Sequence, residues 1–522
     1  MKDLKDLSLN EKIGQLLLIG FNGYNLSEEL ISMIREYKFG NFIIFSRNIK
    51  DLNQLEKLIR DIYNEVIKSL GIIPFIAIDQ EGGMSIRIKE KNTYYPGSMT
   101  LASTNSSNAE IIGHMMGKDL ISLGINMNLA PVLDVNTNPK NPIIGNRSYS
   151  DNPETVSKFG NSLIKGMQEE GLIATCKHFP GHGDVEVDSH LGLPILNSDI
   201  NRIDKIELKP FKDAINNGVK NIMTAHIIFK EIDNENPATL SEKILKGILR
   251  NKLKYNGIIT SDCMEMKAIS KGITTRIGAM KGIKAGIDLV CICHTKERQI
   301  ESMKEIKKAI DDNFINIEEI DEKIQRILKC KRQVYEIMNQ KYCNNKENLN
   351  IFNDDNNYKI IQRIVDSSLT FVNGKKLELK GKILLYGFRP YNVNIKEDST
   401  KEDEEDIIYL INQEIPSIHT IEYKKNEYSE ELINKSKDYD TVIFISFNAF
   451  SNPLQAKMIN ELNKICHNFF VISIGNPYDF LKIENNINYY TMYEYTPNSI
   501  RTVVKFLKGE IEAIGKLPIS LN

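Results

Sequence analysis

The chain of 522 residues contains no tryptophan, no long apolar run and no excess of charge of either sign. Its apolar runs fall well short of the roughly 20 residues that cross a bilayer, so we expect no membrane partner. The 67 Lys+Arg and 69 Asp+Glu residues leave a formal net charge of −2. Because nucleic-acid binders carry a basic excess, we expect no nucleic-acid partner.

Cysteine is scarce and shows no metal or disulfide pattern. The seven cysteines are scattered, with a C-x-C at Cys291–Cys293 and no C-x-x-C. This pattern favours reduced, mostly buried thiols over a disulfide framework or a zinc site. The N-terminal segment MKDLKDLSLNEKIGQLLLIGF mixes acidic and basic residues and lacks the layout of a secretory signal. We therefore expect a cytoplasmic protein.

Short apolar runs, each followed by a helical pattern, recur through the first 300 residues. Buried strands that alternate with helices are typical of a parallel sheet. Eight such units predict a (β/α)8 barrel over residues 1–343. A doubly wound open sheet is the rival, but no glycine-rich phosphate turn follows an early strand. The runs are 15–21, 40–46, 73–79, 125–133, 172–179, 221–226, 257–262 and 289–293.

Many of these runs end in polar residues that carry chemistry. In a barrel the carboxyl ends of all strands lie on one face, and this face holds the active site. The pattern therefore predicts a shared site. The residues are Asp79, Asp134, Lys177, His178, His226 and Asp262.

A polar segment rich in Asn and Asp, residues 344–357, predicts a linker. Beyond it, the apolar runs 381–388, 441–447 and 468–475 alternate with helical stretches. Residues 358–522 are therefore expected to form a smaller α/β/α sandwich of three layers. The chain would then have two domains, within the two to four that its length allows at roughly 100–200 residues per domain.

Three of the eight histidines lie in KHFPGHGDVEVDSH, which runs from Lys177 to His190. His178 and His182 are four apart, but the Pro and Gly between them forbid the regular helix that a metal pair would need. A serine triad at Asp188–Ser189–His190 is also disfavoured, because no G-x-S-x-G precedes the serine. We expect no metal.

Asp188 and His190 lie two residues apart in this loop, and an Asp beside an imidazole can fix its tautomer. His190 is thus a candidate general acid/base, although the loop's polar residues also fit a purely structural role. Asp262 ends a buried strand, where it is either an ionised carboxylate or a helix N-cap. A carboxylate and a separate proton donor are what the cleavage of a glycosidic bond requires.

Five segments make the chain similar to the bacterial β-N-acetylglucosaminidases of glycoside hydrolase family 3, the group that includes muropeptide-recycling enzymes. The resemblance covers the barrel in order and continues more weakly through the second domain. The segments are IDQEGG (78–83), NLAPVLDVNTNP (128–139), IGNRSYSD (144–151), KHFPGHGDVEVDSHLGLP (177–194) and ITSDCMEM (259–266).

The resemblance implies that Asp262 is the nucleophile, and that His190 is the acid/base with Asp188 as its partner. It implies that the terminal sugar is bound by Asp79, Arg87, Arg147, Lys177 and His178. Without tryptophan, this sugar pocket must use polar contacts or Phe and Tyr.

The expected reaction is the retaining removal of terminal β-linked N-acetylglucosamine from peptidoglycan fragments, chitooligosaccharides or glycoconjugates, without a cofactor. One alternative is phosphorolysis, because a histidine base, unlike a carboxylate, does not repel an incoming phosphate. A β-glucosidase and a non-catalytic sugar-binding protein are further alternatives. The sequence contains no signal for an oligomeric state.

Since the barrel itself supplies His190, we expect the second domain to stabilise the barrel or shape the site and not to transfer the proton. Among neighbouring residues, Glu81 is expected to brace its loop and His182 to shape it. His226 is either a pocket wall or a satisfied core histidine. Cys263 follows Asp262 where many relatives have Asp, and we assign it no role.

Overall fold

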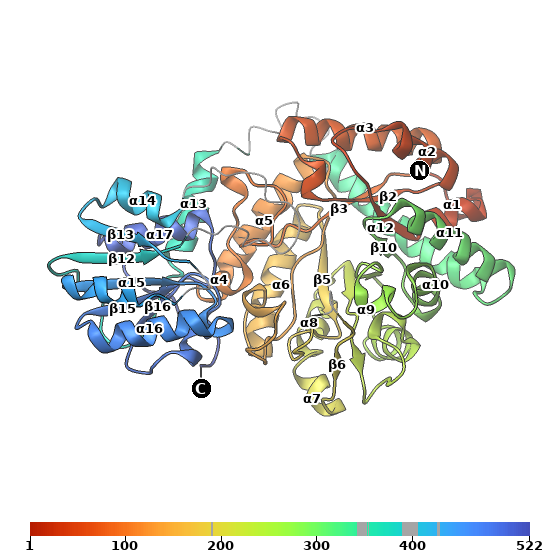
Figure 1. The fold of residues 1–522 in the computed structure, drawn as a ribbon. Helices are drawn as coiled ribbons and strands as arrows, with labels where there is room; N and C mark the ends of the chain where they lie inside the picture. Colours follow the sequence, from red (N-terminus) through yellow and green to blue (C-terminus); the bar gives the residue numbers. More distant parts are fainter. Residues whose placement is uncertain (189–191, 342–351, 353, 389–405, 425–427, 522) are drawn as a thin grey trace.

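Eight parallel strands form the sheet of the first domain, drawn in red to green in Figure 1. The computed structural model describes residues 1–188, 192–341, 352, 354–388, 406–424 and 428–521. The strand order is β10-β1-β2-β3-β4-β5-β7-β9. The two ends of the sheet meet at a bridge between Thr260 and Leu289. The predicted barrel is therefore confirmed. Its strands are β1 (Leu17–Gly20), β2 (Asn41–Ile44), β3 (Phe75–Ile78), β4 (Met127–Asn128), β5 (Ile173–Phe179), β7 (Asn221–Thr224), β9 (Ile258–Ser261) and β10 (Val290–Ile292).

The strands form because each is a short apolar run that is covered on both faces. All four residues of β3 have no exposed surface, and each fully buried Ile or Phe contributes roughly 1.5–3 kcal/mol relative to exposure. Strand β4 covers only part of the 125–133 run, and Pro131 within that run has no N–H to donate. The chain still follows β5, since Leu133 N donates to Lys177 O at 2.7 Å.

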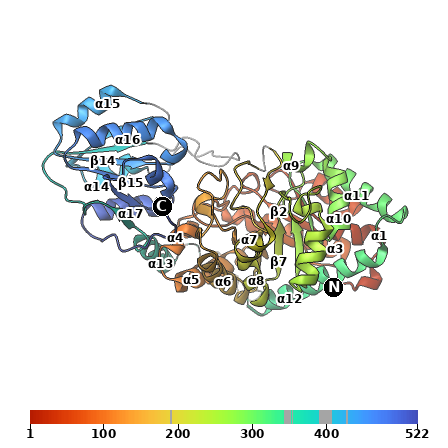
Figure 2. The same cartoon turned by 90° about the horizontal axis from the view of Figure 1, so that it is seen from below.

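Helices cover the outside of the barrel (Figures 1 and 2). Helix α3 shows why they form where they do. The side chain of Asp51 accepts from Gln54 N at its start, and Gly71 ends it at φ +68°. The helices are α1 (Leu9–Gln15), α2 (Glu28–Tyr37), α3 (Leu52–Leu70), α4 (Ser98–Ala102), α5 (Ser106–Ser122), α6 (Pro153–Glu169), α7 (Ile200–Lys205), α8 (Lys209–Asn216), α9 (Lys267–Ser270), α10 (Thr275–Ala285), α11 (Lys296–Asp311) and α12 (Ile317–Lys341), with a π-helix at Lys243–Lys252 and a separate strand pair, β6 (Ile195–Leu196) and β8 (Ile228–Phe229).

The second domain, blue in Figure 1, is a six-stranded sheet between two helical layers, as predicted. The strand order is β11-β16-β15-β14-β12-β13, and only β11 is antiparallel to its neighbour. Helices α13, α14 and α17 cover one face, and α15 and α16 cover the other. The elements are α13 (Asp355–Asp366), β11 (Thr370–Asn373), β12 (Ile383–Gly387), α14 (Ile407–Glu414), β13 (Ile418–Glu422), α15 (Glu430–Lys435), β14 (Thr441–Ser446), α16 (Pro453–Ile465), β15 (Phe469–Ser473), β16 (Asn488–Thr491) and α17 (Pro497–Leu507).

The segment between the domains differs in one respect from the expectation. Helix α13 begins at Asp355, so the last residues of the predicted 344–357 linker are helical. Residues 342–351 and 353 lie outside the described residues. No helix in the described part of the chain combines the length and apolar character that a membrane crossing needs.

Candidate active site

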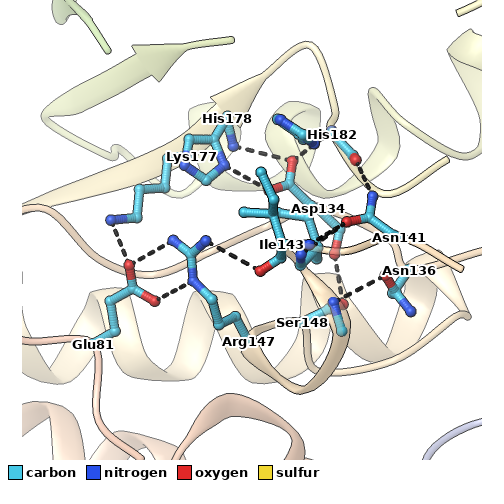
Figure 3. A network of polar contacts seen from close by, with 12 residues as sticks. Glu81, Asp134, Asn136, Asn141, Ile143, Arg147, Ser148, Lys177, His178 and His182 are labelled. Carbon is cyan, nitrogen blue, oxygen red and sulfur yellow. Dashed lines mark hydrogen bonds and ion pairs between the residues drawn. The ribbon is translucent and has the colours of Figure 1, made fainter. Parts of the chain in front are cut away.

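Lys177 joins two acidic residues at the end of the barrel, and Figure 3 shows its contact with one of them, Glu81. Its Nζ lies 2.9 Å from Asp79 Oδ1 and 2.6 Å from Glu81 Oε1. Strand β5 carries Lys177, and the carboxylates follow β3. The Lys177 side chain is only 3% exposed. Burial acts to lower the Lys177 pKa, but the charges of Asp79 and Glu81 outweigh it and raise the pKa above its usual value. The ammonium is therefore fixed and charged.

Arg147 binds Glu81 from a second loop. Its Nε donates to Glu81 Oε2 at 2.9 Å and its Nη2 to Glu81 Oε1 at 2.8 Å. Burial acts to raise the Glu81 pKa, but Arg147 and Lys177 outweigh it and hold that pKa well below its usual range. Both oxygens of Glu81 are thus engaged by cations. This geometry agrees with the expected bracing role of Glu81.

Asp79 keeps part of its surface open to solvent. Its Oδ2 lies 3.6 Å from Arg87 Nη2, and the Asp79 and Arg87 side chains are 20% and 24% exposed. The Arg87 guanidinium also lies 5.7 Å from the centre of the Phe45 ring. A charged carboxylate and guanidinium that are held in place yet accessible are suited to binding sugar hydroxyls.

Asp134 orients His178, a role that the sequence analysis did not assign. The fully buried carboxylate lies 2.8 Å from His178 Nδ1 through Oδ2. Its Oδ1 accepts the backbone N–H groups of His178 at 3.1 Å and His182 at 2.7 Å. Burial acts to raise the Asp134 pKa, but the charge and hydrogen bonds of His178 outweigh it and lower that pKa. The only sequence signal was the position of Asp134 after the fourth apolar run.

Asp262 follows β9, and its Oδ1 accepts the backbone N–H of Cys263 at 2.7 Å. Asp79 follows β3, and β3 and β9 run parallel in the same barrel sheet. Asp262 and Asp79 therefore lie at the same end of the barrel.

His226 supports the segment after β9. Its Nδ1 lies 2.8 Å from Thr239 Oγ1, and its Nε2 lies 3.1 Å from the Cys263 carbonyl oxygen. The residue is 1% exposed. It is therefore a satisfied core histidine that also holds the residue after Asp262.

Asp188 is half-buried on the loop after β5. His190 and its neighbours, residues 189–191, lie outside the described residues. The pairing of Asp188 with His190 therefore stays a prediction from the sequence.

The second domain contacts the loop that carries Arg147. Asn146 Nδ2 donates to the Tyr493 carbonyl oxygen at 2.7 Å. Asn136 Nδ2 donates to Tyr478 Oη at 2.8 Å, and its Oδ1 accepts from Gly145 N at 3.2 Å. The second domain thus contacts the turn that carries Arg147 directly through Asn146, and indirectly through Asn136, which binds both Tyr478 and Gly145.

The second domain also contacts the segment that precedes α4. The buried Glu494 carboxylate accepts from Gly97 N at 2.7 Å and from Thr100 Oγ1 at 2.6 Å. Gly97 packs against Gly83, so a Cβ on either glycine would lie within about 3.2 Å of the Glu494 carboxylate. The D-Q-E-G-G loop, which carries Asp79 and Glu81, therefore rests against the second domain.

Residues 8–330 match the glycosyl hydrolase family 3 N-terminal domain. The chain belongs to glycosyl hydrolase family 3. Beta-hexosaminidase A of Pseudoalteromonas piscicida is 33% identical over 368 residues, which are 63% of this chain and 62% of that protein. The chain therefore spans just under two thirds of this relative. Beta-hexosaminidase of Actinobacillus pleuropneumoniae serotype 5b (strain L20) is 36% identical over 299 residues, 56% of this chain and 85% of that protein.

A solved family 3 structure resembles the chain over both domains. It is the β-N-acetylglucosaminidase from Paenibacillus sp. str. FPU-7, with a TM-score of 0.91 and 33% identity. The match covers 99% of each chain. The barrel and sandwich are thus one shared family 3 architecture.

Proposed function

We propose that this family 3 protein is a retaining exo-β-N-acetylglucosaminidase. Its substrates would be peptidoglycan fragments or chitooligosaccharides that end in β-linked N-acetylglucosamine. The observation that carries the proposal is the network of Lys177, Asp79, Glu81 and Arg147 at the barrel end that also bears Asp262. The names of the two relatives and the Paenibacillus structure support the same activity.

Asp262 is proposed as the nucleophile, and His190, oriented by Asp188, as the acid/base. In the first step an Asp262 oxygen attacks the anomeric carbon, the glycosidic C–O bond breaks, and His190 gives its proton to the leaving oxygen. In the second step His190 takes a proton from water, whose oxygen displaces Asp262 from the anomeric carbon. Two inversions at this carbon retain the β-configuration.

The terminal sugar is proposed to bind to Asp79, Arg87, Arg147, Lys177 and His178. The partly exposed Asp79 accepts from hydroxyls, and the cations donate to oxygens of the sugar. The ion pairs of Glu81 and the contacts of Asp134 hold these side chains in fixed orientations. Sugar binding therefore costs little further side-chain entropy.

The second domain is proposed to position the sugar-binding loops. Its contacts with Asn136, Asn146 and Gly97 support this role. We also infer that the protein works in the reducing cytoplasm. The six cysteines within the described residues support this inference, because all are free thiols.

The test compares wild type with Asp262→Ala and His190→Ala on an aryl β-N-acetylglucosaminide. Both variants should lose most of their turnover. Azide should rescue Asp262→Ala as the α-glycosyl azide, by one inversion, and His190→Ala as the β-glycosyl azide, through the covalent intermediate. Asp61→Ala, on the outer face of α3, is the matched control and should keep full activity.

An active Asp262→Ala, or a β-azide from it, would show that the nucleophile is another residue. Product analysis with and without phosphate separates hydrolysis from phosphorolysis. A sugar 1-phosphate as main product would favour the phosphorylase. Binding without turnover in the wild type would favour the non-catalytic alternative.

A further inference from the structure

A thiol, a carboxylate and an imidazole lie together beside Asp262. Cys263 and Glu265 belong to the segment after β9, and His294 to the segment after β10. One potential ligand atom from each of the three lies within 4.8 Å of the other two. This cluster takes no part in the proposed hydrolysis.

The two segments are locked together by the carboxylate itself. Glu265 Oε2 accepts the backbone N–H of His294 at 2.6 Å, and its Oε1 accepts that of Thr295 at 3.1 Å. The Glu265 side chain is only 5% exposed. His294 is exposed and Cys263 is half-buried, so the cluster opens to solvent on one side. The spacing of the three groups is therefore built into the backbone, and an ion from solution can reach them.

The mixture of donor types points to one class of ion. Mg²⁺ and Ca²⁺ prefer sites made only of oxygen, whereas thiolate, imidazole and carboxylate together are typical of Zn²⁺. Ligands about 2.0–2.3 Å from a tetrahedral ion lie about 3.3–3.8 Å from one another, a spacing that small side-chain rotations would reach. We propose that Cys263, Glu265 and His294 bind a thiophilic divalent cation of the Zn²⁺ class, and that its binding inhibits the enzyme.

A second thiol lies beside the first. Cys293 forms a hydrogen bond with Cys263, so it is available as a fourth ligand in place of water. The incoming ion displaces the Cys263 thiol proton to solvent.

Two guanidinium groups limit the affinity. Arg298 lies 3.5 Å from Glu265, and Arg47 lies 3.4 Å from His294 Nδ1. Their positive charges oppose a divalent cation, while Glu265 and the Cys263 thiolate attract it. This balance favours reversible binding that a chelator can undo.

Inhibition follows from the position of Cys263. Its backbone N–H donates to Asp262 Oδ1 at 2.7 Å. An ion on the Cys263 thiolate places positive charge next to the Asp262 carboxylate and fixes the peptide that contacts it. Both effects weaken a nucleophile. This inhibitory part rests on the proposed function, whereas ion binding does not.

The binding test uses Co²⁺ and Zn²⁺ with the full-length protein and no substrate. Wild type should show the near-ultraviolet charge-transfer absorption of a thiolate–Co²⁺ bond, and Cys263→Ser should lose most of this absorption. His294→Ala, a change at an exposed side chain, should weaken Zn²⁺ binding by more than about tenfold. Thermal unfolding verifies that each variant is folded.

Two control variants separate this cluster from others. Cys466→Ser removes a distant thiol in the second domain. His114→Ala disrupts the surface cluster of Glu110, His114 and Glu169, another grouping with metal-ligand geometry. Both should keep the Co²⁺ absorption. Absence of this absorption from wild type, undiminished absorption in Cys263→Ser, or unchanged Zn²⁺ affinity in His294→Ala would overturn the site.

Turnover is then compared with and without Zn²⁺. Wild type should be inhibited reversibly, and Cys263→Ser should be much less sensitive. Binding without any change in turnover would overturn the inhibitory part. If the wild type binds the ion but has no hydrolytic activity at all, the proposed function fails and the ion site stands.

Discussion

Arg147 and Glu81 form a two-point ion pair across 66 residues of sequence, with N–O distances of 2.8 and 2.9 Å. Lys177 adds a third contact to the same carboxylate at 2.6 Å. Glu81 therefore fixes two cations that are proposed to bind the sugar, from two different elements. We therefore propose Glu81 as a positioning residue, with the more exposed Asp79 and Arg87 contacting the sugar.

Replacing Glu81 with Gln should impair both stability and substrate binding. The change leaves Arg147 and Lys177 with one less counter-charge in a buried site, which costs about 3–5 kcal/mol. We expect KM to rise by more than about tenfold because both cations lose their fixed orientation. Denaturant unfolding and steady-state kinetics measure the two effects.

The matched control is Glu56→Gln on α3. Glu56 pairs with Arg60 at 2.6 Å, but this pair is exposed, so its loss should change stability by less than about 1 kcal/mol. Equal effects of the two changes would show that Glu81 is an ordinary surface partner.

Replacing Asp134 with Asn should impair turnover by changing the tautomer of His178. The Asn Oδ1 can still accept both backbone N–H groups, but its Nδ2 would donate to His178 Nδ1 and move the ring proton to Nε2. We expect kcat/KM to fall by roughly tenfold to a hundredfold, with little loss of stability. Kinetics on the aryl substrate measure this.

Asp233→Asn is the control for this change. Asp233 is also buried and also accepts two backbone N–H groups, those of Glu235 and Asn236. It contacts no histidine within the described residues. A similar fall in kcat/KM for both variants would contradict the tautomer argument.

The fold was largely predictable because its signals are local. Eight buried apolar runs produced eight barrel strands, and continuous burial leaves few other arrangements. The sandwich was predicted from three strands only. Strands β11 and β13 at its edges are partly exposed, so they lack a continuous apolar run. Strand β16 is buried but carries Asn488 and two tyrosines, which do not stand out as a strand.

The site was only partly predictable, because the residues that support the proposed sugar-binding side chains do so through contacts between distant segments. Lys177 and Asp79 were named from their positions at the ends of apolar runs, and the resemblance added their sugar-binding role. Their separation of 2.9 Å follows from barrel closure. The role of Asp134 required knowing that the chain after β4 runs beside β5. The contacts of Tyr478 and Glu494 with the barrel required the domain arrangement. No local pattern encodes either relationship.

Replacing Tyr478 with Phe should test whether the second domain shapes the site. The change removes the acceptor for Asn136 Nδ2, and an unsatisfied buried donor costs about 1–3 kcal/mol. Because Asn136 also holds Gly145 at the start of the Arg147 turn, KM should rise severalfold. Unfolding and kinetics are measured on the same preparations.

Tyr386→Phe provides the comparison. Tyr386 Oη donates to the Leu432 carbonyl oxygen inside the second domain, away from the barrel. This variant should lose comparable stability while its KM stays at the wild-type value. If both variants change KM equally, the effect of Tyr478 is general destabilisation and not positioning.

The pH dependence of stability should reveal the buried state of His182. Burial, the charge of His178 and that of Arg147 lower its pKa from 6.5 to about 4, against the opposing charge of Asp134. Between pH 4 and pH 6.5, His182 is therefore protonated in the unfolded chain but neutral in the folded chain. The stabilising contribution is complete above pH 6.5 and is lost as pH falls from 6.5 toward 4, by up to about 3 kcal/mol.

His182→Gln should remove this pH-dependent loss of stability. As pH falls from 6.5 to 4, wild type should therefore become less stable relative to the variant.

Asp119→Asn should give the opposite trend. Burial raises the Asp119 pKa from 3.8 to about 7, so the wild-type contribution is present below pH 3.8 and lost as pH rises toward 7. Unfolding free energies measured from pH 4 to 7 give both differences. A difference between wild type and His182→Gln that does not vary with pH would show that His182 titrates normally in the folded protein.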